Sequence, residues 1–232
     1  MPMISGKRVI AAMLTALMAV TFTANTAVSV YATGVTATEN AQTIDAQSTD
    51  AQALTPEEQK AQELQQVYDM PVESNGYKDW PQGPGTYGEA GIVMEVGTGA
   101  ILYAKNIDAH EYPASITKVL TALVALENGQ LTDNVTFSHD SVAFLQRGDS
   151  SVGLKEGNVI TLDQAMHAML LASANEAAYA IGESVGVNAG HDYNWFIEQM
   201  NSRCKELGGE NSNFANTNGL HDPNHYTCAR DM

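Results

Sequence analysis

The sequence predicts an α+β fold, in which a short antiparallel hairpin precedes several helices. Two β-rich runs at 91–96 and 100–104 flank a turn that contains two glycines, which is the pattern of a β-hairpin. A nearly apolar run at 115–128 and a capping-box match at 161–164 indicate that helices follow the hairpin. No internal repeat is evident, so a single folded domain accounts for these elements.

The first predicted helix, 115–128, has Pro113 near its start and Gly129 at its C-terminal cap. Its apolar residues leave little polar surface, so we expect this helix to be buried on most sides. After it, residues 135–137 indicate a short strand, and 138–160 is expected to be largely loop.

Two further helices are predicted nearer the C-terminus. The first begins with the capping box at Thr161, is interrupted at 173–175, and resumes from 176 to about 185. The second spans roughly 193–207, carries apolar residues on its inner side, and ends at two glycines. A last helix is expected to begin at Thr227.

Residues 1–32 have the pattern of a secretory signal peptide. Two basic residues precede an apolar run over 9–22, and small residues stand at the cleavage positions. A retained membrane anchor is the alternative interpretation, because the apolar run can be extended to Val30. Asn25 and several threonines interrupt that longer run, which favours export and a location outside the cytoplasm, in the cell wall or at the outer face of the membrane.

Residues 33–69 form an acidic, low-complexity segment in which only Lys60 carries positive charge. Such a segment buries little apolar surface, so we expect a flexible linker before the folded part at 70–232. Within it, 54–67 has the start signal of a helix at Thr55. The formal net charge of −16 argues against nucleic-acid binding, which needs basic patches.

Ser115 and Lys118 form an S-x-x-K tetrad at the start of the 115–128 helix, where backbone N–H groups favour developing negative charge. Residues three apart share a helix face, so Lys118 can reach the Ser115 hydroxyl and, if burial lowers its pKa, act as its base. An N-cap serine beside a lysine that extends to solvent is the alternative interpretation. The tetrad alone decides nothing, because Ser202 and Lys205 repeat it on a surface-like stretch.

Ser173 and Asn175 form an S-x-N element that interrupts an otherwise apolar helical run. Its hydroxyl and amide are suited to relaying a proton and holding a peptide amide in a cleft. A plain corner between two helices is the alternative, since both residue types favour such breaks. Finding S-x-x-K and S-x-N in this order favours catalysis by Ser115.

Other reactive residues give weaker signals. In an exported chain, Cys204 and Cys228 either form a disulfide or stay two buried thiols, and their spacing does not decide. His221, Asp222 and His225 suggest a metal site, but they fall in a turn, and zinc needs three protein ligands in a defined geometry. We expect no metal and no cofactor.

The two motifs occur in a chain that resembles the low-molecular-mass penicillin-binding proteins, and among them the serine-type D-alanyl-D-alanine carboxypeptidases. The resemblance runs from about residue 91 to the end of the sequence. It is carried by GIVMEVGTGAILYAKN, PASITKVLTALVALENG, TLDQAMHAMLLASANEAAYAI, FIEQMNSRCKELG and FANTNGLHDPNHYTCARDM. It implies a β-lactamase/DD-peptidase-like fold, with an antiparallel sheet packed with helices and a mainly helical subdomain.

The resemblance also implies a role for each motif residue. Ser115 would be the acylated nucleophile, Lys118 its general base, and Ser173 and Asn175 the second catalytic and substrate-binding element. The implied substrate is a peptidoglycan stem pentapeptide ending in D-Ala-D-Ala, from which the terminal D-alanine is removed through an acyl-enzyme. β-Lactam antibiotics would be covalent inhibitors that acylate the same serine.

Two departures from the family pattern stand out. The K-T-G element does not occur in the sequence, so we expect a C-terminally truncated member in which 70–232 is a partial catalytic domain with an incomplete sheet. Such a fragment is expected to be inactive as given, and a family-type amphipathic membrane anchor would lie beyond Met232. Cys228 stands where the family usually has threonine, and we expect little consequence.

Three alternative functions stay open at this point. A non-catalytic cell-wall-binding relative would keep the fold without turnover. A class A β-lactamase would need a deacylating glutamate on a later loop, whereas Glu176, directly after Asn175, fits the carboxypeptidase pattern. A secreted adhesive or coat protein would not be labelled by penicillin at all.

Overall fold

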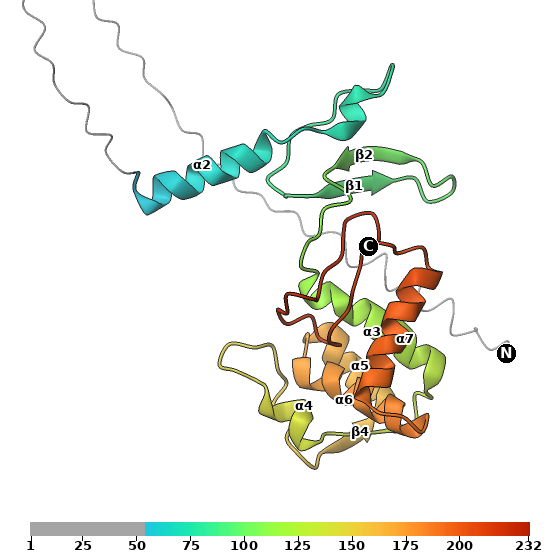
Figure 1. Cartoon of the computed structure of the whole chain (residues 1–232). Coiled ribbons are helices and arrows are strands. Elements are labelled where there is room, and N and C mark those ends of the chain that lie inside the picture. Colours follow the sequence, from blue (N-terminus) through green and yellow to red (C-terminus); the bar gives the residue numbers. More distant parts are fainter. Residues whose placement is uncertain (1–53) are drawn as a thin grey trace, which may run out of the picture. The chain divides into compact units, whose positions relative to one another are not determined.

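The computed structural model describes residues 54–232 (Figure 1). The predicted signal peptide, 1–32, and most of the predicted linker lie outside the described residues. The helix expected in the described part of the linker is present as α2 (Pro56–Tyr68), which Thr55 and Glu58 open with both bonds of a capping box. Within 54–232, no helix is long and apolar enough to cross a membrane.

The predicted hairpin is confirmed. β1 (Gly91–Met94) pairs antiparallel with β2 (Ile101–Lys105), and the connection between them is the glycine-containing turn. The short 3-10 helix η1 (Glu73–Gly76) contacts this hairpin, and the Ser74 hydroxyl accepts the backbone N–H of Ala104 at 3.3 Å. The hairpin is therefore tied to the segment that precedes it in the chain.

The helical part is organised around α6, which contacts four other helices, α3, α4 (His139–Ala143), α5 and α7 (Figure 1). The bounds are α3 (Thr117–Asn128), α5 (Leu162–Leu171), α6 (Asn175–Asn188) and α7 (Tyr193–Glu206). The buried side of α6 is rich in alanine, and small side chains let neighbouring helices approach closely. Phe196 and Met200 of α7 fill the core between them. The three helices predicted from the sequence are confirmed, and their packing brings the first turn of α6 against the first turn of α3.

A second small sheet joins β3 (Asn134–Thr136) to β4 (Val159–Thr161) in antiparallel pairing. The strand predicted at 135–137 is therefore present, shifted by one residue. The expectation of a largely irregular 138–160 was incomplete, because this stretch also contains α4 (His139–Ala143). Two-stranded antiparallel sheets beside packed helices make up the predicted α+β fold.

The expectation of a helix starting at Thr227 was wrong. The backbone of Thr227 pairs with Glu111 in an isolated antiparallel bridge, with N–H···O distances of 2.9 and 2.7 Å. The Thr227 carbonyl, which would accept the first bond of such a helix, is taken by Glu111, and a single turn follows instead, in which the Met232 N–H donates to the Cys228 carbonyl at 3.2 Å. The two cysteines, Cys204 and Cys228, are buried free thiols in the structure.

Candidate active site

Ser115 lies in a sharp turn immediately before α3. The turn is the 3-10 helix η2 (Ala114–Ile116), so the serine sits just outside the α-helix that the sequence predicted to contain it. Ala114 has a φ of +49°, and Gly219, with a φ of +85°, lies against the backbone of Ala114. A Cβ at position 219 would lie 1.8 Å from the Ala114 carbonyl oxygen, so only glycine fits this close approach. The turn leaves the Ser115 side chain exposed to an incoming ligand.

Lys118 is the buried centre of the site, with only 2% of its surface exposed. Its Nζ lies 3.2 Å from Ser115 Oγ, 2.8 Å from Asn175 Oδ1 and 2.6 Å from the backbone oxygen of Asn218. Burial lowers the pKa of Lys118 from 10.5 to about 8, although the negative charge of Glu176 acts in the opposite direction. A neutral Lys118 can donate to the two amide oxygens and accept the proton of the Ser115 hydroxyl.

Ser173 and Asn175 reach the same cluster from the junction between α5 and α6. Ser173, at a φ of +55°, directs its hydroxyl to Ser115 Oγ at 2.9 Å. Asn175 is the first residue of α6, and its side chain bonds Lys118. The structure thus brings all four sequence-predicted site residues together in one continuous set of hydrogen bonds.

Glu176 is a part of the site to which the sequence assigned no role. Its side chain is fully buried, and Oε1 accepts from the Ser151 hydroxyl and from the N–H groups of Val152 and Gly153 at 2.7, 2.8 and 3.2 Å. The next residue back, Asn175, donates its own N–H to Ser150 at 2.9 Å. The first turn of α6 therefore fixes the 150–153 segment. The sequence did offer a signal for Glu176, because an acidic residue in a buried helical run needs polar partners nearby.

The buried His225 ring links Thr117 at the start of α3 to the backbone of Ala215, and both of its nitrogens are used in these hydrogen bonds. The backbone N–H of Ala215 donates to its Nδ1 at 3.0 Å, so the ring proton is on Nε2, which donates to Thr117 Oγ1 at 2.7 Å. Burial lowers the pKa of His225, which keeps the ring neutral. Within 54–232, no three His, Cys, Asp or Glu side chains gather in a way that could hold a metal ion.

The 215–219 loop supplies the backbone carbonyl that binds Lys118, and several contacts hold this loop in place. Thr121 of α3 donates its hydroxyl to the carbonyl of Thr217 at 2.8 Å, one residue before the carbonyl that binds Lys118. With the His225 bond at one end and the close approach of Gly219 at the other, the loop is anchored along its whole length. Sequence reasoning missed this loop, because its partners lie about 100 residues away in the chain.

A serine and a buried lysine on one helical turn, supported by a second serine and an asparagine, define the class of serine–lysine acyl-transfer sites. The family model described as D-alanyl-D-alanine carboxypeptidase, peptidase family S11, matches residues 81–232. The chain therefore belongs to this family, as its resemblance predicted.

Individual relatives agree with this assignment. The chain is 34% identical over 146 residues to D-alanyl-D-alanine carboxypeptidase DacA of Haemophilus influenzae, covering 61% of this chain and 36% of the relative. It is 33% identical over 149 residues to DacF of Bacillus subtilis, covering 62% and 36%. The chain thus spans about a third of the length of these curated relatives.

The solved structure of penicillin binding protein 5 from Haemophilus influenzae superposes with a TM-score of 0.58 at 31% identity, covering 66% of this chain and 44% of that one. The structural neighbours are DD-peptidases with the β-lactamase-like fold, which confirms the predicted fold class.

Proposed function

We propose that the protein is an exported serine-type D-Ala-D-Ala carboxypeptidase, which removes the terminal D-alanine from peptidoglycan stem pentapeptides. The observation that carries the proposal is the bond between Lys118 Nζ and Ser115 Oγ at 3.2 Å, made by a lysine whose pKa is lowered to about 8. A lysine with such a pKa is a base for the serine near neutral pH, which an ordinary lysine is not. Membership of the D-alanyl-D-alanine carboxypeptidase family supports the choice of substrate.

In the acylation step, Ser115 Oγ attacks the carbonyl carbon of the penultimate D-alanine while its proton passes to Lys118. The tetrahedral intermediate places its oxyanion near the Ser115 N–H, which supplies one hydrogen bond to the developing charge. Collapse breaks the peptide bond, and the leaving D-alanine nitrogen takes a proton, for which the Ser173 hydroxyl, 2.9 Å from Ser115 Oγ, is a suitable relay. An ester on Ser115 results.

In the deacylation step, a water molecule attacks the ester carbonyl and gives one proton to Lys118. The Ser115 oxygen leaves and recovers a proton, which restores the free enzyme and releases the shortened peptide. Asn175 holds Lys118 through Oδ1 and leaves its Nδ2 for a substrate carbonyl, which suits it to a substrate-binding role. A β-lactam would acylate Ser115 by the same attack, with its ring C–N bond taking the place of the peptide bond.

The test uses protein expressed from the complete reading frame. We expect it to release D-alanine from a D-Ala-D-Ala pentapeptide and to be labelled by a fluorescent penicillin, and expect Ser115→Ala to lose both activities. Ser202→Ala is the matched control, because Ser202 belongs to the second, exposed S-x-x-K tetrad and should leave both unchanged. Labelling without D-alanine release would instead favour a non-catalytic wall-binding relative, and labelling that persists in Ser115→Ala would overturn the nucleophile assignment.

A further inference from the structure

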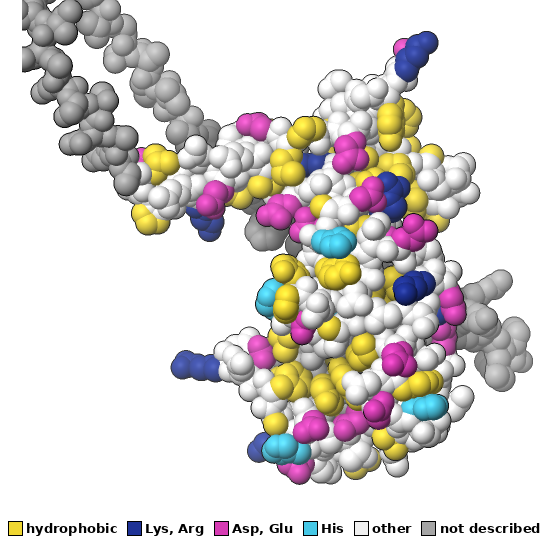
Figure 2. All heavy atoms as spheres, viewed as in Figure 1, with side chains coloured by type: hydrophobic (Ala, Val, Ile, Leu, Met, Phe, Trp, Pro, Cys, Tyr) yellow, Lys and Arg dark blue, Asp and Glu magenta, His cyan; other side chains and the backbone are white. Residues whose placement is uncertain are grey.

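Four aromatic side chains lie at the surface of the segment that joins α2 to the hairpin. Tyr77 and Tyr87 are 54% and 62% exposed, and Tyr68 and Trp80 are 37% and 36% exposed. Figure 2 shows hydrophobic side chains, a class in which it includes tyrosine and tryptophan, between the end of α2 and the hairpin. Exposed apolar side chains that are grouped in this way mark a surface that binds a partner. We call these four residues the aromatic platform.

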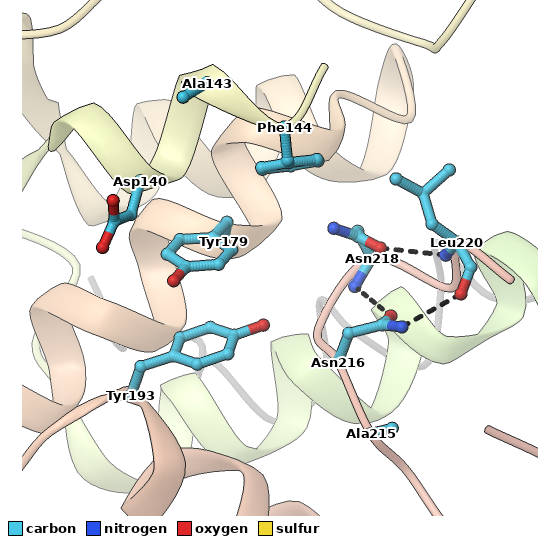
Figure 3. A pocket seen from close by; sticks show the side chains of 9 residues that line it. All are labelled: Asp140, Ala143, Phe144, Tyr179, Tyr193, Ala215, Asn216, Asn218 and Leu220. Atoms are coloured by element: carbon cyan, nitrogen blue, oxygen red, sulfur yellow. Dashed lines mark hydrogen bonds between the residues drawn. The ribbon is translucent and has the colours of Figure 1, made fainter. Parts of the chain in front are cut away.

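The platform is separate from the aromatic rings beside the active site. Those rings belong to residues 144, 179 and 193 and line a hollow of about 560 Å³ next to Asn218, whose backbone oxygen binds Lys118 (Figure 3). All residues that line the hollow come after position 139. Three of the four platform residues, in contrast, precede the 81–232 region that matches the carboxypeptidase family. The platform therefore lies largely on a part of the chain that the family match does not cover.

Strand β2 anchors one end of the platform. The Trp80 indole donates its Nε1–H to the backbone oxygen of Leu102 at 3.0 Å, which fixes the ring against the outer edge of the strand.

Lys105, at the other end of β2, anchors the tyrosines. This lysine is fully buried, and its Nζ donates to the backbone oxygens of Val67 and Thr86 at 2.5 and 2.7 Å. These two residues directly precede Tyr68 and Tyr87 in the chain. The anchors at 102 and 105 are three residues apart along the strand, or about 10 Å, which is comparable with the length of a disaccharide unit.

The tyrosine rings are packed and therefore preorganised for a ligand. Tyr68 and Tyr87 contact each other with ring centroids 4.8 Å apart. A Cβ at Gly85 would lie 2.8 Å from the Tyr68 ring, so the 83–85 segment can lie flat against this ring only because glycine stands there. The Tyr103 hydroxyl holds the same segment by donating to the backbone oxygen of Pro84 at 3.0 Å. Rings that are already fixed lose little conformational entropy when a ligand binds.

The charges around the platform argue against an anionic partner. Residues 68–90 contain four acidic side chains and a single basic one, Lys78. Tryptophan and tyrosine also suit a membrane interface, but a surface of this sign repels anionic lipid headgroups, as it repels nucleic acid. A neutral sugar ring fits better, because its C–H groups pack on an aromatic face while its hydroxyls bond to tyrosine hydroxyls and water.

We infer that the aromatic platform binds a glycan strand of the cell wall, a β-linked polymer of N-acetylated amino sugars. Trp80 stacks on one sugar ring, and the pair formed by Tyr68 and Tyr87 stacks on another. The inference rests on the proposed function, because the wall glycan is the polymer to which the stem peptides are attached. Holding the strand raises the concentration of stem peptides around Ser115.

The test measures the binding of a hexasaccharide of β-1,4-linked N-acetylglucosamine by calorimetry, on protein from the complete reading frame. This sugar carries no peptide, so its binding does not report on the catalytic cluster. We expect Trp80→Ala and Tyr87→Ala each to weaken binding about five-fold, through the loss of one stacked ring, and Trp80→Phe to weaken it less. Tyr112→Ala is the matched control, because Tyr112 is 60% exposed but lies outside the platform, and it should leave binding unchanged.

No binding of the hexasaccharide would overturn the platform, as would binding that survives Tyr87→Ala, which removes only an exposed ring. An equal loss in Tyr112→Ala, or attachment to phosphatidylglycerol vesicles without hexasaccharide binding, would also overturn it. Penicillin labelling separates this failure from failure of the proposed function. Labelling at Ser115 without sugar binding rejects the platform alone, whereas an absence of labelling rejects the function on which the assignment to wall glycan rests.

Discussion

The rate at which Ser115 is acylated should rise with pH until Lys118 has lost its proton. Burial lowers the pKa of Lys118 from 10.5 to about 8. At pH 7, about one Lys118 in ten is then neutral, whereas an ordinary lysine is neutral in only about one molecule in 3,000. The lowered pKa therefore supplies roughly 300 times more base at neutral pH.

The assay is the second-order rate constant for labelling by a fluorescent penicillin, measured across pH on protein from the complete reading frame. The rate should climb about tenfold per pH unit at low pH and level off above the pKa of Lys118. Glu176→Gln removes the charge that raises the pKa of Lys118, so the midpoint should move to lower pH. Glu198→Gln, an exposed change on α7, should leave the midpoint in place.

Two results would refute this reasoning. A midpoint near 10.5 would mean that burial does not lower the pKa of Lys118. A midpoint that Glu176→Gln moves upward would mean that the carboxylate does not act on Lys118 through its charge, and that its bonds to the 151–153 segment dominate instead.

Three further substitutions test the supports of the site. Gly219→Ala should abolish labelling and lower the melting temperature, because the new Cβ would overlap the Ala114 carbonyl. Gly208→Ala is the control: it has a similar φ of +98° but lies in open space, so it should lower the free energy of unfolding by only about 1 kcal/mol. His225→Ala should lower the free energy of unfolding by about 1–3 kcal/mol in denaturant titrations, because it removes both ring hydrogen bonds. His225→Gln should lose less, since its amide can replace both bonds. Equal losses in the two variants would contradict the role given to the ring. Ser173→Ala should slow acylation about 100-fold or more with an unchanged melting temperature, and an unchanged rate would remove Ser173 from the proton relay.

Local patterns were enough to predict most elements of the fold. The capping box at Thr161 forms as expected, with its hydroxyl accepting from Gln164, because both partners lie within one helical turn. The hairpin was recognisable for the same reason, since its two β-rich runs and the glycine-containing turn are adjacent in the chain. Thr227 was misassigned because its partner, Glu111, is remote, and no local signal shows that its backbone is already paired.

The same distinction applies to the site. Ser115 and Lys118 could be paired from spacing alone, and S-x-N could be added because it breaks a helical pattern. The carbonyl of Asn218 and the anchoring by His225 could not be predicted, because they depend on how the 215–219 loop packs against α3. The lowered pKa of Lys118 depends on that packing, since burial is its main cause.

The identity of the acylated residue is the most direct test of the account. Protein from the complete reading frame is incubated with a penicillin, digested, and analysed by tandem mass spectrometry to locate the added acyl group. We expect one penicilloyl group, on Ser115, and none on Ser173 or on Ser202 of the exposed tetrad. An acyl group on either of those serines, or none on Ser115, would contradict it.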